Sequence, residues 1–337
     1  MSMLLSDSPP VDRLSEVDRS VRDRLTWSSG KADLYAVDQY FREACGTFAE
    51  DLDAMLGVAL CMLKSEATAG RRLRPALEIL AGAGFRPVDV VRFQHDRMTI
   101  REVWRYQFNI ATRERIEAMD AILPSTDTVC LVLRDERWTP GAVPAAVRLN
   151  SLKGPADPKL RGPEHLRHRL GVVNGLFNFL HISDEPADVL REIAVLCDEP
   201  RRELMRDRIR SGFDAVPAVL EVFDDLERRH PEHDFDLERS WQRLAEVPGA
   251  LGEPARRRAR GEEAGLREVL ALVRAEPLDS PSRWDLLTVV THLLTEMSLS
   301  WVTPTVPTVT ASYVRETPSD APSDAPSDVL GTTGAGA

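Results

Sequence analysis

An eight-residue apolar run, Leu56–Leu63, is the feature that most restricts what this chain can fold into. Every position in the run is apolar or glycine, and its length suits a strand better than a helix. A strand without polar alternation is buried on both faces of its sheet. The chain therefore needs covering elements on both sides of a sheet built around this run.

Strand and helix patterns alternate after this run, as far as Cys197. The strand-like stretches are Phe85–Phe93, Thr126–Leu133 and Leu176–Leu180. Helical spacing of apolar side chains follows Leu73 and covers Val103–Leu123, and Ser183-Asp184-Glu185-Pro186 has the residue types that open a helix. This order predicts an α+β fold with a ferredoxin-like antiparallel sheet in residues 56–199.

The regions on either side of 56–199 have a different character. Residues 1–55 are predicted to form a partly helical N-terminal arm, because a polar start is followed by a ragged apolar stripe. Residues 200–312 are predicted to form an all-α region, with candidate helices Arg202–Arg229, Asp236–Val247, Pro254–Ala275 and Ser282–Trp301. The Pro-Ser-Asp-Ala repeats favour a disordered tail at 313–337.

Composition excludes several classes of protein. The 337 residues are 43% hydrophobic, enough for a core, and carry 43 basic against 54 acidic residues for a net charge of −11. This balance disfavours partners such as nucleic acid or an anionic membrane. No apolar run reaches membrane-spanning length, no signal peptide is evident, and the four cysteines are widely spaced. A cytoplasmic protein is expected.

The segment around His181 carries the most chemical information. His181 stands at the end of a predicted strand, just before a helix start, and Glu192 follows eleven residues later. A histidine in that place is held rigidly at a cleft, and a carboxylate on the next helix can accept its second ring proton. Backbone amides at the helix start can assist an anion. The pattern favours attack on a phosphate through a phosphohistidine.

This segment resembles the Asn-x-x-His-Gly-Ser-Asp motif of nucleoside diphosphate kinases, in which the histidine is the nucleophile and a glutamate in the next helix is its partner. Asn178, His181, Ser183 and Glu192 match the motif in type and spacing, as does Asp184. The matching region runs from about residue 56 to 197, less than half of the chain.

Upstream residues extend the resemblance. Lys64, at the end of the first strand, is similar to the family lysine that touches phosphate and ribose, and Gly84-Phe85 matches the pair that opens the second strand. Gly154-Pro155-Ala156-Asp157-Pro158 resembles the family's Gly-Pro-Thr-Asp-Pro loop, and Arg167 follows where a phosphate-binding arginine is expected. Trp104 aligns with a tyrosine near the phosphates.

Several positions depart from the family pattern. Ile182 replaces the glycine after the histidine, and Ala156 replaces a phosphate-contacting threonine. Asn150 fills the place of a second phosphate-binding arginine, for which Arg148 is the candidate substitute. Phe108 is only a weak candidate for the phenylalanine that stacks on the base.

The resemblance implies phosphoryl transfer from ATP or another nucleoside triphosphate, with Mg²⁺ held mainly by the phosphates, to a nucleoside diphosphate or related acceptor. His181 and Glu192 would be catalytic and Ser183 supporting. The residues expected to bind nucleotide or phosphate are Lys64, Trp104, Arg148, Arg167 and Asn178.

The alternative is a catalytically weak or inactive nucleotide-binding scaffold. In that interpretation His181 is a core or capping histidine, Ser183 is only an N-cap, and the helical C-terminal half binds a protein partner. Family members form oligomers, so a homo-oligomer is the other partner class that the sequence leaves open.

Overall fold

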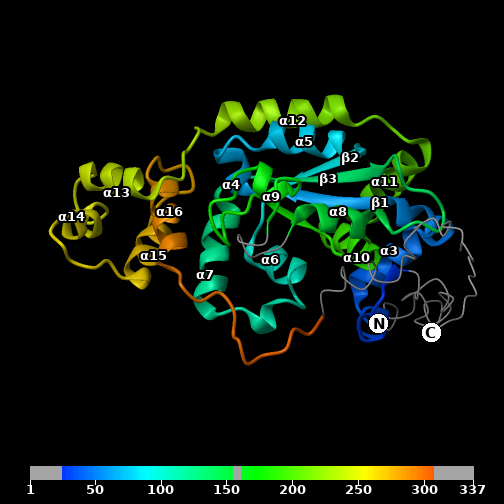
Figure 1. Cartoon of the computed structure of the whole chain (residues 1–337), viewed down its shortest axis with the longest axis horizontal. Helices are drawn as coiled ribbons and strands as arrows, with labels where there is room; N and C mark the ends of the chain where they lie inside the picture. Colours follow the sequence, from blue (N-terminus) through cyan, green and yellow to red (C-terminus); the bar gives the residue numbers. More distant parts are fainter. Residues whose placement is uncertain (1–24, 155–160, 307–337) are drawn as a thin grey trace, which may run out of the picture.

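A four-stranded antiparallel sheet lies at the centre of the chain (Figure 1), in the computed structural model that describes residues 25–154 and 161–306. The expectations for residues 1–24, Ala156 and the 313–337 tail fall outside these described residues. The strands are β1 Val58–Leu63, β2 Phe85–Phe93, β3 Thr128–Asp135 and β4 Leu180–Ile182.

The sheet has the ferredoxin-like topology that the sequence predicts. Its strand order is β2-β3-β1-β4, and every neighbouring pair is antiparallel. A helical connection separates β1 from β2 and β3 from β4, as in the split βαβ arrangement. Every residue of β1 is buried, which confirms that both faces of the sheet are covered.

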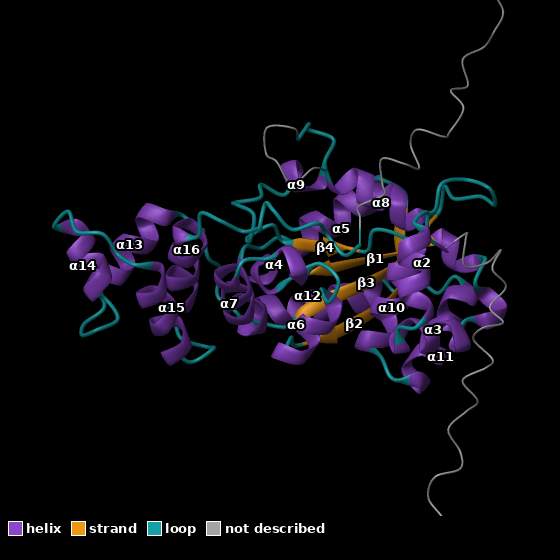
Figure 2. Cartoon of the chain, turned by 90° about the horizontal axis from the view of Figure 1, so that it is seen from below, coloured by secondary structure: helices purple, strands orange, loops and turns teal. Residues whose placement is uncertain are grey.

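The helices surround the sheet and extend well beyond it (Figure 2). They are α2 Ser29–Ala36, α3 Gln39–Thr47, α4 Ser65–Ala69, α5 Leu73–Gly82, α6 Arg97–Val103, α7 Arg113–Ile122, α8 Ala145–Lys153, α9 Leu166–Arg169, α10 Pro186–Leu196, α11 Glu199–Ser211, α12 Val216–Arg229, α13 Leu237–Glu246, α14 Glu253–Ala259, α15 Leu266–Ala275 and α16 Arg283–Leu293. Short 3₁₀ turns cover Ala49–Asp51, Ala54–Gly57, Phe108–Ile110 and Leu123–Ser125.

Two predicted elements of the sheet region are wrong in their extent. The helical stretch expected over Val103–Leu123 is helical only from Arg113, after the end of α6 and a 3₁₀ turn, because the Thr112 side chain caps α7 by accepting from the backbone N–H of Arg115. The strand expected from Leu176 begins only at Leu180, because the Asn174 side chain folds the preceding residues into a turn.

The all-α character of the C-terminal region is confirmed, but its first two helices pack against the sheet. The predicted helix Arg202–Arg229 breaks at Gly212, which has a left-handed φ of 61° and ends α11. Both α11 and α12 pack against β2, and α12 lies over α5 on the side of the sheet away from α10 (Figure 1).

The outer edge of β2 is closed by this pair of helices. The backbone N–H of Ala215 donates to the carbonyl of Pro87 at 3.1 Å, and the Arg201 guanidinium donates to the carbonyl of Val90 at 3.0 Å. The buried carboxylate of Asp89 accepts from Arg201 and Arg208 on α11. The carbonyls of Pro87 and Val90 are therefore not offered to another strand.

The helices α13 to α16 form a separate bundle beside α7 (Figure 1). As expected from its apolar sequence, α16 lies at the bundle centre, packed on α13, α15 and α7. Its buried Arg283 donates to the hydroxyl of Ser125 and to the carbonyl of Ala121, at 2.9 and 2.8 Å. These bonds join the bundle to the end of α7.

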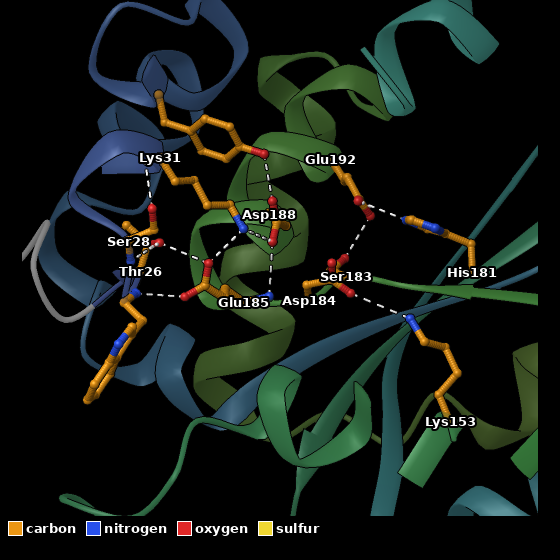
Figure 3. A network of polar contacts seen from close by, with 12 residues as sticks. Thr26, Ser28, Lys31, Lys153, His181, Ser183, Asp184, Glu185, Asp188 and Glu192 are labelled. Atoms are coloured by element: carbon orange, nitrogen blue, oxygen red, sulfur yellow. Dashed lines mark hydrogen bonds and ion pairs between the residues drawn. The ribbon is translucent and has the colours of Figure 1, made fainter. Parts of the chain in front are cut away.

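The N-terminal helix α2 is fastened to α10 by buried charges (Figure 3). The ammonium of Lys31 contacts the carboxylates of Glu185 at 2.7 Å and Asp188 at 2.5 Å. Glu185 also accepts from the Thr26 hydroxyl and from the backbone of Trp27. Glu185 and Asp188 form a capping box at the start of α10, so this network fixes where the helix begins.

Lys31 is shared between carboxylates that repel one another. Burial disfavours its charged form, but the charges of Asp188 and Glu185 outweigh this effect and raise the pKa of Lys31 above its ordinary value. Burial, reinforced by Asp184, Glu185 and Glu192, raises the pKa of Asp188 to about 6 despite the ion pair. The network therefore depends on one ammonium for its charge balance.

Replacing this ammonium should destabilise the fold strongly. Lys31→Met leaves Glu185 and Asp188 buried without a cation, which we expect to cost about 3–5 kcal/mol in the free energy of unfolding measured with urea. The exposed pair of Arg267 with Glu114 supplies a control, because Arg267→Met should cost under about 1 kcal/mol. Equal losses in the two variants would show that the Lys31 network is solvated.

Candidate active site

His181, Glu192 and Ser183 meet in one hydrogen-bonded group (Figure 3). His181 Nε2 lies 2.8 Å from Glu192 Oε1, and the hydroxyl of Ser183 donates to Glu192 Oε2 at 2.7 Å. Because a carboxylate only accepts, Nε2 carries the proton and the lone pair lies on Nδ1. Glu192 is 5% exposed, so the contact is shielded from water. Ser183 thus holds the carboxylate of Glu192 in place. It is not the N-cap of α10, because that position is occupied by Glu185.

A tight turn sets the entry of the chain into β4. Phe179 has a φ of 66°, and the N–H of Leu180 donates to the carbonyl of Asn178 at 2.8 Å, which closes a γ-turn. The backbone N–H of Phe179 donates to Glu66, and its carbonyl accepts from the backbone of Lys64. Such a conformation costs on the order of 1–3 kcal/mol, so these fixed partners hold it in place.

Ile182 does not obstruct the site. Successive side chains of a strand point to opposite faces of the sheet, so Ile182 and His181 diverge. Ile182 is 1% exposed and belongs to the apolar core, where it pairs with Cys61 across β1 and β4. The bulk that replaces a glycine at this position is therefore absorbed by the core.

A cavity with an empty volume of about 620 Å³ lies beside His181. Its polar lining consists of Lys64, Trp104, Arg115, Lys153, Arg167, Asn178 and His181. Its apolar and glycine lining consists of Met119, Ile122, Leu123, Gly175, Leu176 and Leu180. Basic side chains from β1, α7, α8 and α9 thus converge on the face that presents the histidine, which suits a phosphorylated ligand.

Lys64 enters the cavity from the end of β1. Its ammonium pairs with Glu66 at 2.7 Å and donates to the carbonyl of Leu176 at 3.1 Å. Burial lowers the pKa of Lys64, while the charge of Glu66 acts in the opposite direction. The ammonium is held in place on the wall of the cavity.

Arg167 and Asn178 both retain bonding capacity. Arg167 donates to the carbonyl of Gly154 at 3.0 Å, but its Nε has no partner within the described residues. Burial and the charge of Arg161 lower the pKa of Arg167 to about 10, so it is still a cation at neutral pH. Asn178 donates to the carbonyl of Gly175, and its buried side-chain oxygen has no partner in the described part of the chain.

Arg148 lies outside the cavity. Its guanidinium pairs with the buried Asp135 at 2.5 Å, donates to the carbonyl of Ala83 and lies over the ring of Phe85. These contacts hold the end of β3 against the turn before β2. The suggested replacement for the second family arginine therefore has a structural position, and Asn150 does not line the cavity either.

Arg115 and Lys153 line the cavity without having been predicted. The ammonium of Lys153 lies 3.5 Å from Asp184, beside the motif, and burial lowers the pKa of Lys153. Arg115 comes from α7, where burial lowers the pKa of its guanidinium. The position of Lys153 just before the Gly-Pro loop is a sequence signal for a cavity residue. No comparable local signal distinguishes Arg115 from Arg113 on the same helix.

Trp104 packs against His181, and His95 packs against Trp104. The ring of Trp104 lies edge-on to His181 with centroids 5.2 Å apart, and His95 lies between Phe93 and Trp104. His95 is 2% exposed, and neither ring nitrogen has a hydrogen-bond partner among the described residues. Burial and the nearby His181 and Lys64 lower the pKa of His95 to about 3.

Solved structures of nucleoside diphosphate kinases resemble this chain distantly. The enzyme from Halobacterium salinarum in complex with CDP shares 19% identity at a TM-score of 0.35, covering 43% of this chain and 89% of the other. The Pyrobaculum aerophilum enzyme gives 19% and 0.35, covering 43% and 97%. That from Borrelia burgdorferi, with vanadate and ADP, gives 16% and 0.36, covering 43% and 88%. No protein-family model and no curated protein matches the sequence.

The described residues contain no cluster of three or more His, Cys, Asp or Glu side chains suited to a metal ion. No helix in 25–154 or 161–306 is long and apolar enough to cross a membrane.

Protonation of His95 should weaken the fold in acid. Because its pKa is about 3 in the folded protein and about 6.5 when unfolded, the unfolded state binds the extra proton as pH falls below 6.5. The free energy of unfolding of the native chain should therefore fall, and that of His95→Leu should not. Between pH 7.5 and pH 5 we expect the difference between the two to change by about 2 kcal/mol in favour of His95→Leu. Urea unfolding at both pH values measures this, with the exposed His168→Leu as control. An unchanged difference for His95→Leu would contradict the prediction.

Proposed function

We propose that this protein transfers a phosphoryl group from a nucleoside triphosphate through a phosphohistidine at His181. The observation that carries the proposal is the hydrogen bond between His181 Nε2 and Glu192, beside a cavity lined by basic side chains. The bond leaves Nδ1 as the nucleophilic nitrogen, and no hydrogen bond within the described residues engages it.

In the first half-reaction the lone pair of Nδ1 attacks the terminal phosphorus in line. A bond forms between Nδ1 and phosphorus, the bond from phosphorus to the bridging oxygen breaks, and a nucleoside diphosphate leaves with that electron pair. The proton on Nε2 stays between His181 and Glu192, whose carboxylate balances the positive charge that develops on the ring. The Ser183 hydroxyl keeps that carboxylate turned toward the histidine.

Lys64 and Arg167 are the residues that offset phosphate charge, while Trp104 and Asn178 shape the space around the reacting group. Mg²⁺ enters as part of the nucleotide substrate, bound to its phosphates. In the second half-reaction the phosphohistidine passes its group to the phosphate oxygen of a nucleoside diphosphate or a related acceptor. The bond between Nδ1 and phosphorus that forms in the first transfer breaks in the second and returns the electron pair to Nδ1, so the kinetics are ping-pong.

A nucleotide-binding scaffold is the competing function, favoured by the absence of Asn150 and Arg148 from the cavity lining. A scaffold needs the basic lining but gains nothing from an oriented imidazole. The buried Glu192, held by Ser183 and directed at His181, favours the enzyme. Labelling with a phosphoryl donor separates the two.

Incubation with γ-³²P ATP or GTP and Mg²⁺ should leave acid-labile, base-stable label on the native chain. His181→Ala should carry none, because Nδ1 is the attachment point, while His168→Ala on the exposed face of α9 should label normally. Label that passes to added nucleoside diphosphate supports the kinase, and label that refuses it points to another acceptor. A folded native chain without label would sink the phosphohistidine mechanism.

The contact between Glu192 and His181 should set the rate at which the histidine is phosphorylated. Glu192→Gln should slow formation of the phosphohistidine by roughly 10- to 100-fold, because the neutral amide cannot balance the ring charge. Ser183→Ala should slow it less, since Glu192 keeps its contact with His181. Rapid-quench labelling measures both rates, and native-like rates in Glu192→Gln would remove Glu192 from the mechanism.

A further inference from the structure

The guanidinium of Arg115 faces the cavity with unused hydrogen-bonding capacity. Its Nε is buried and has no partner among the residues that the structure describes, where its Nη1 makes only long contacts of 3.4 Å to the carbonyl of Met297 and the hydroxyl of Ser298. No carboxylate within the described residues pairs with it. Its neighbour on the same helix, Arg113, is instead 77% exposed at the side chain and paired with Glu117.

Residues 294–302, here called the C-terminal strap, leave α16 and pass the start of α7, in orange in Figure 1. The strap forms an isolated antiparallel bridge between Ala111 and Ser298, and the N–H of Leu299 donates to the carbonyl of Ile110 at 2.7 Å. Thr112, which caps α7, donates to the carbonyl of Glu296 through its hydroxyl. The strap therefore binds the N-cap residue Thr112 and the two residues before it, which lead into the helix that carries Arg115.

The strap also touches the cavity wall directly. A Cβ placed on Gly175, a lining residue, would lie 2.4 Å from Met297 Cε, so the methionine packs against this glycine. Asn174 in the same loop donates to Thr291 on α16 at 2.9 Å. The helical C-terminal region thus supports two walls of the cavity, one through α7 and the other through the loop before β4.

The charge balance of the cavity identifies what Arg115 can bind. Lys64 is paired with Glu66, and Lys153 lies near Asp184, so these cations are partly neutralised. Arg115 and Arg167 have no such partner in the described part of the chain, and each has an unbonded Nε. Phosphate oxygens are the acceptors that best fit guanidinium groups arranged in this way.

We propose that Arg115, positioned by the C-terminal strap, binds a phosphate group of a polyphosphate ligand, so that the helical C-terminal region completes the phosphate site. This inference rests on the proposed function only for the identity of the natural ligand. Arg115 would supply charge where Asn150 and Arg148 do not. The strap acts through Arg115 and is a positioning element.

Binding of inorganic tripolyphosphate, measured by calorimetry on the full chain, tests the proposal without requiring any reaction. Arg115→Gln should weaken binding by about 10- to 100-fold, as expected for loss of a charged hydrogen-bond donor. Arg113→Gln is the matched control on the same helix and should bind as the native chain does. Thermal melting of both variants checks that they are folded.

A second pair of variants tests the strap itself. Leu299→Pro removes the N–H that donates to Ile110, whereas Leu299→Ala keeps it. We expect the proline variant to weaken tripolyphosphate binding several-fold and the alanine variant to leave it unchanged. Loss that occurs equally in both would assign the effect to the leucine side chain and overturn the positioning role.

The outcomes separate this inference from the proposed enzyme. Native binding that is lost in Arg115→Gln supports the phosphate site, even if His181 never takes up label. Native labelling of His181 with undiminished tripolyphosphate binding in Arg115→Gln would overturn the inference and leave the enzyme standing. A native chain that fails to bind tripolyphosphate at millimolar concentration would also overturn it.

Discussion

The burial of α10 on all sides is the constraint on which the structure depends. Every residue from Pro186 to Ala194 is buried, and yet the helix carries Asp188, Arg191 and Glu192. A buried charge without a partner costs several kcal/mol, so each must find its counterpart in a neighbouring element. Arg191 pairs with Asp38 and Asp188 pairs with Lys31, while Glu192 accepts hydrogen bonds from His181 and Ser183. The surroundings of α10 are thus arranged around its charges.

This constraint links the N-terminal helices to the chemistry. Lys31 and Asp38 stabilise α10 from one side, and the same helix turns Glu192 toward β4 on the other. The orientation of His181 therefore rests on residues far from it in sequence, in a segment that carries no part of the motif. Figure 3 shows the two groups, the contacts of Glu185 and Asp188 with Thr26 and Lys31 and those of Glu192 with His181 and Ser183, on the same helix.

Sequence reasoning succeeds here where the signal is local. The apolar run of β1 and the spacing from His181 to Glu192 are short-range patterns, and they lead to the central strand and to residues that the structure places together. Arg148 lies apart from the cavity because it pairs with Asp135, a partner that no local pattern in the sequence indicates. Arg115 and Lys31 could not be found, because their roles depend on the strap and on the start of α10. Turns were missed for the same reason, since Phe179 adopts its φ of 66° through bonds to Glu66 and Lys64.

The closed edge of β2 has a consequence for how the chain folds as it is synthesised. All four strands have been made once Ile182 is complete, but the groups that cover β2 come from α11 and the start of α12. A nascent chain would expose an unprotected edge strand during that interval, the situation in which strands pair wrongly with other chains. Residues 200–229 thus protect the edge of β2 from pairing with other chains. A chain shortened to end at residue 199 would lack this protection.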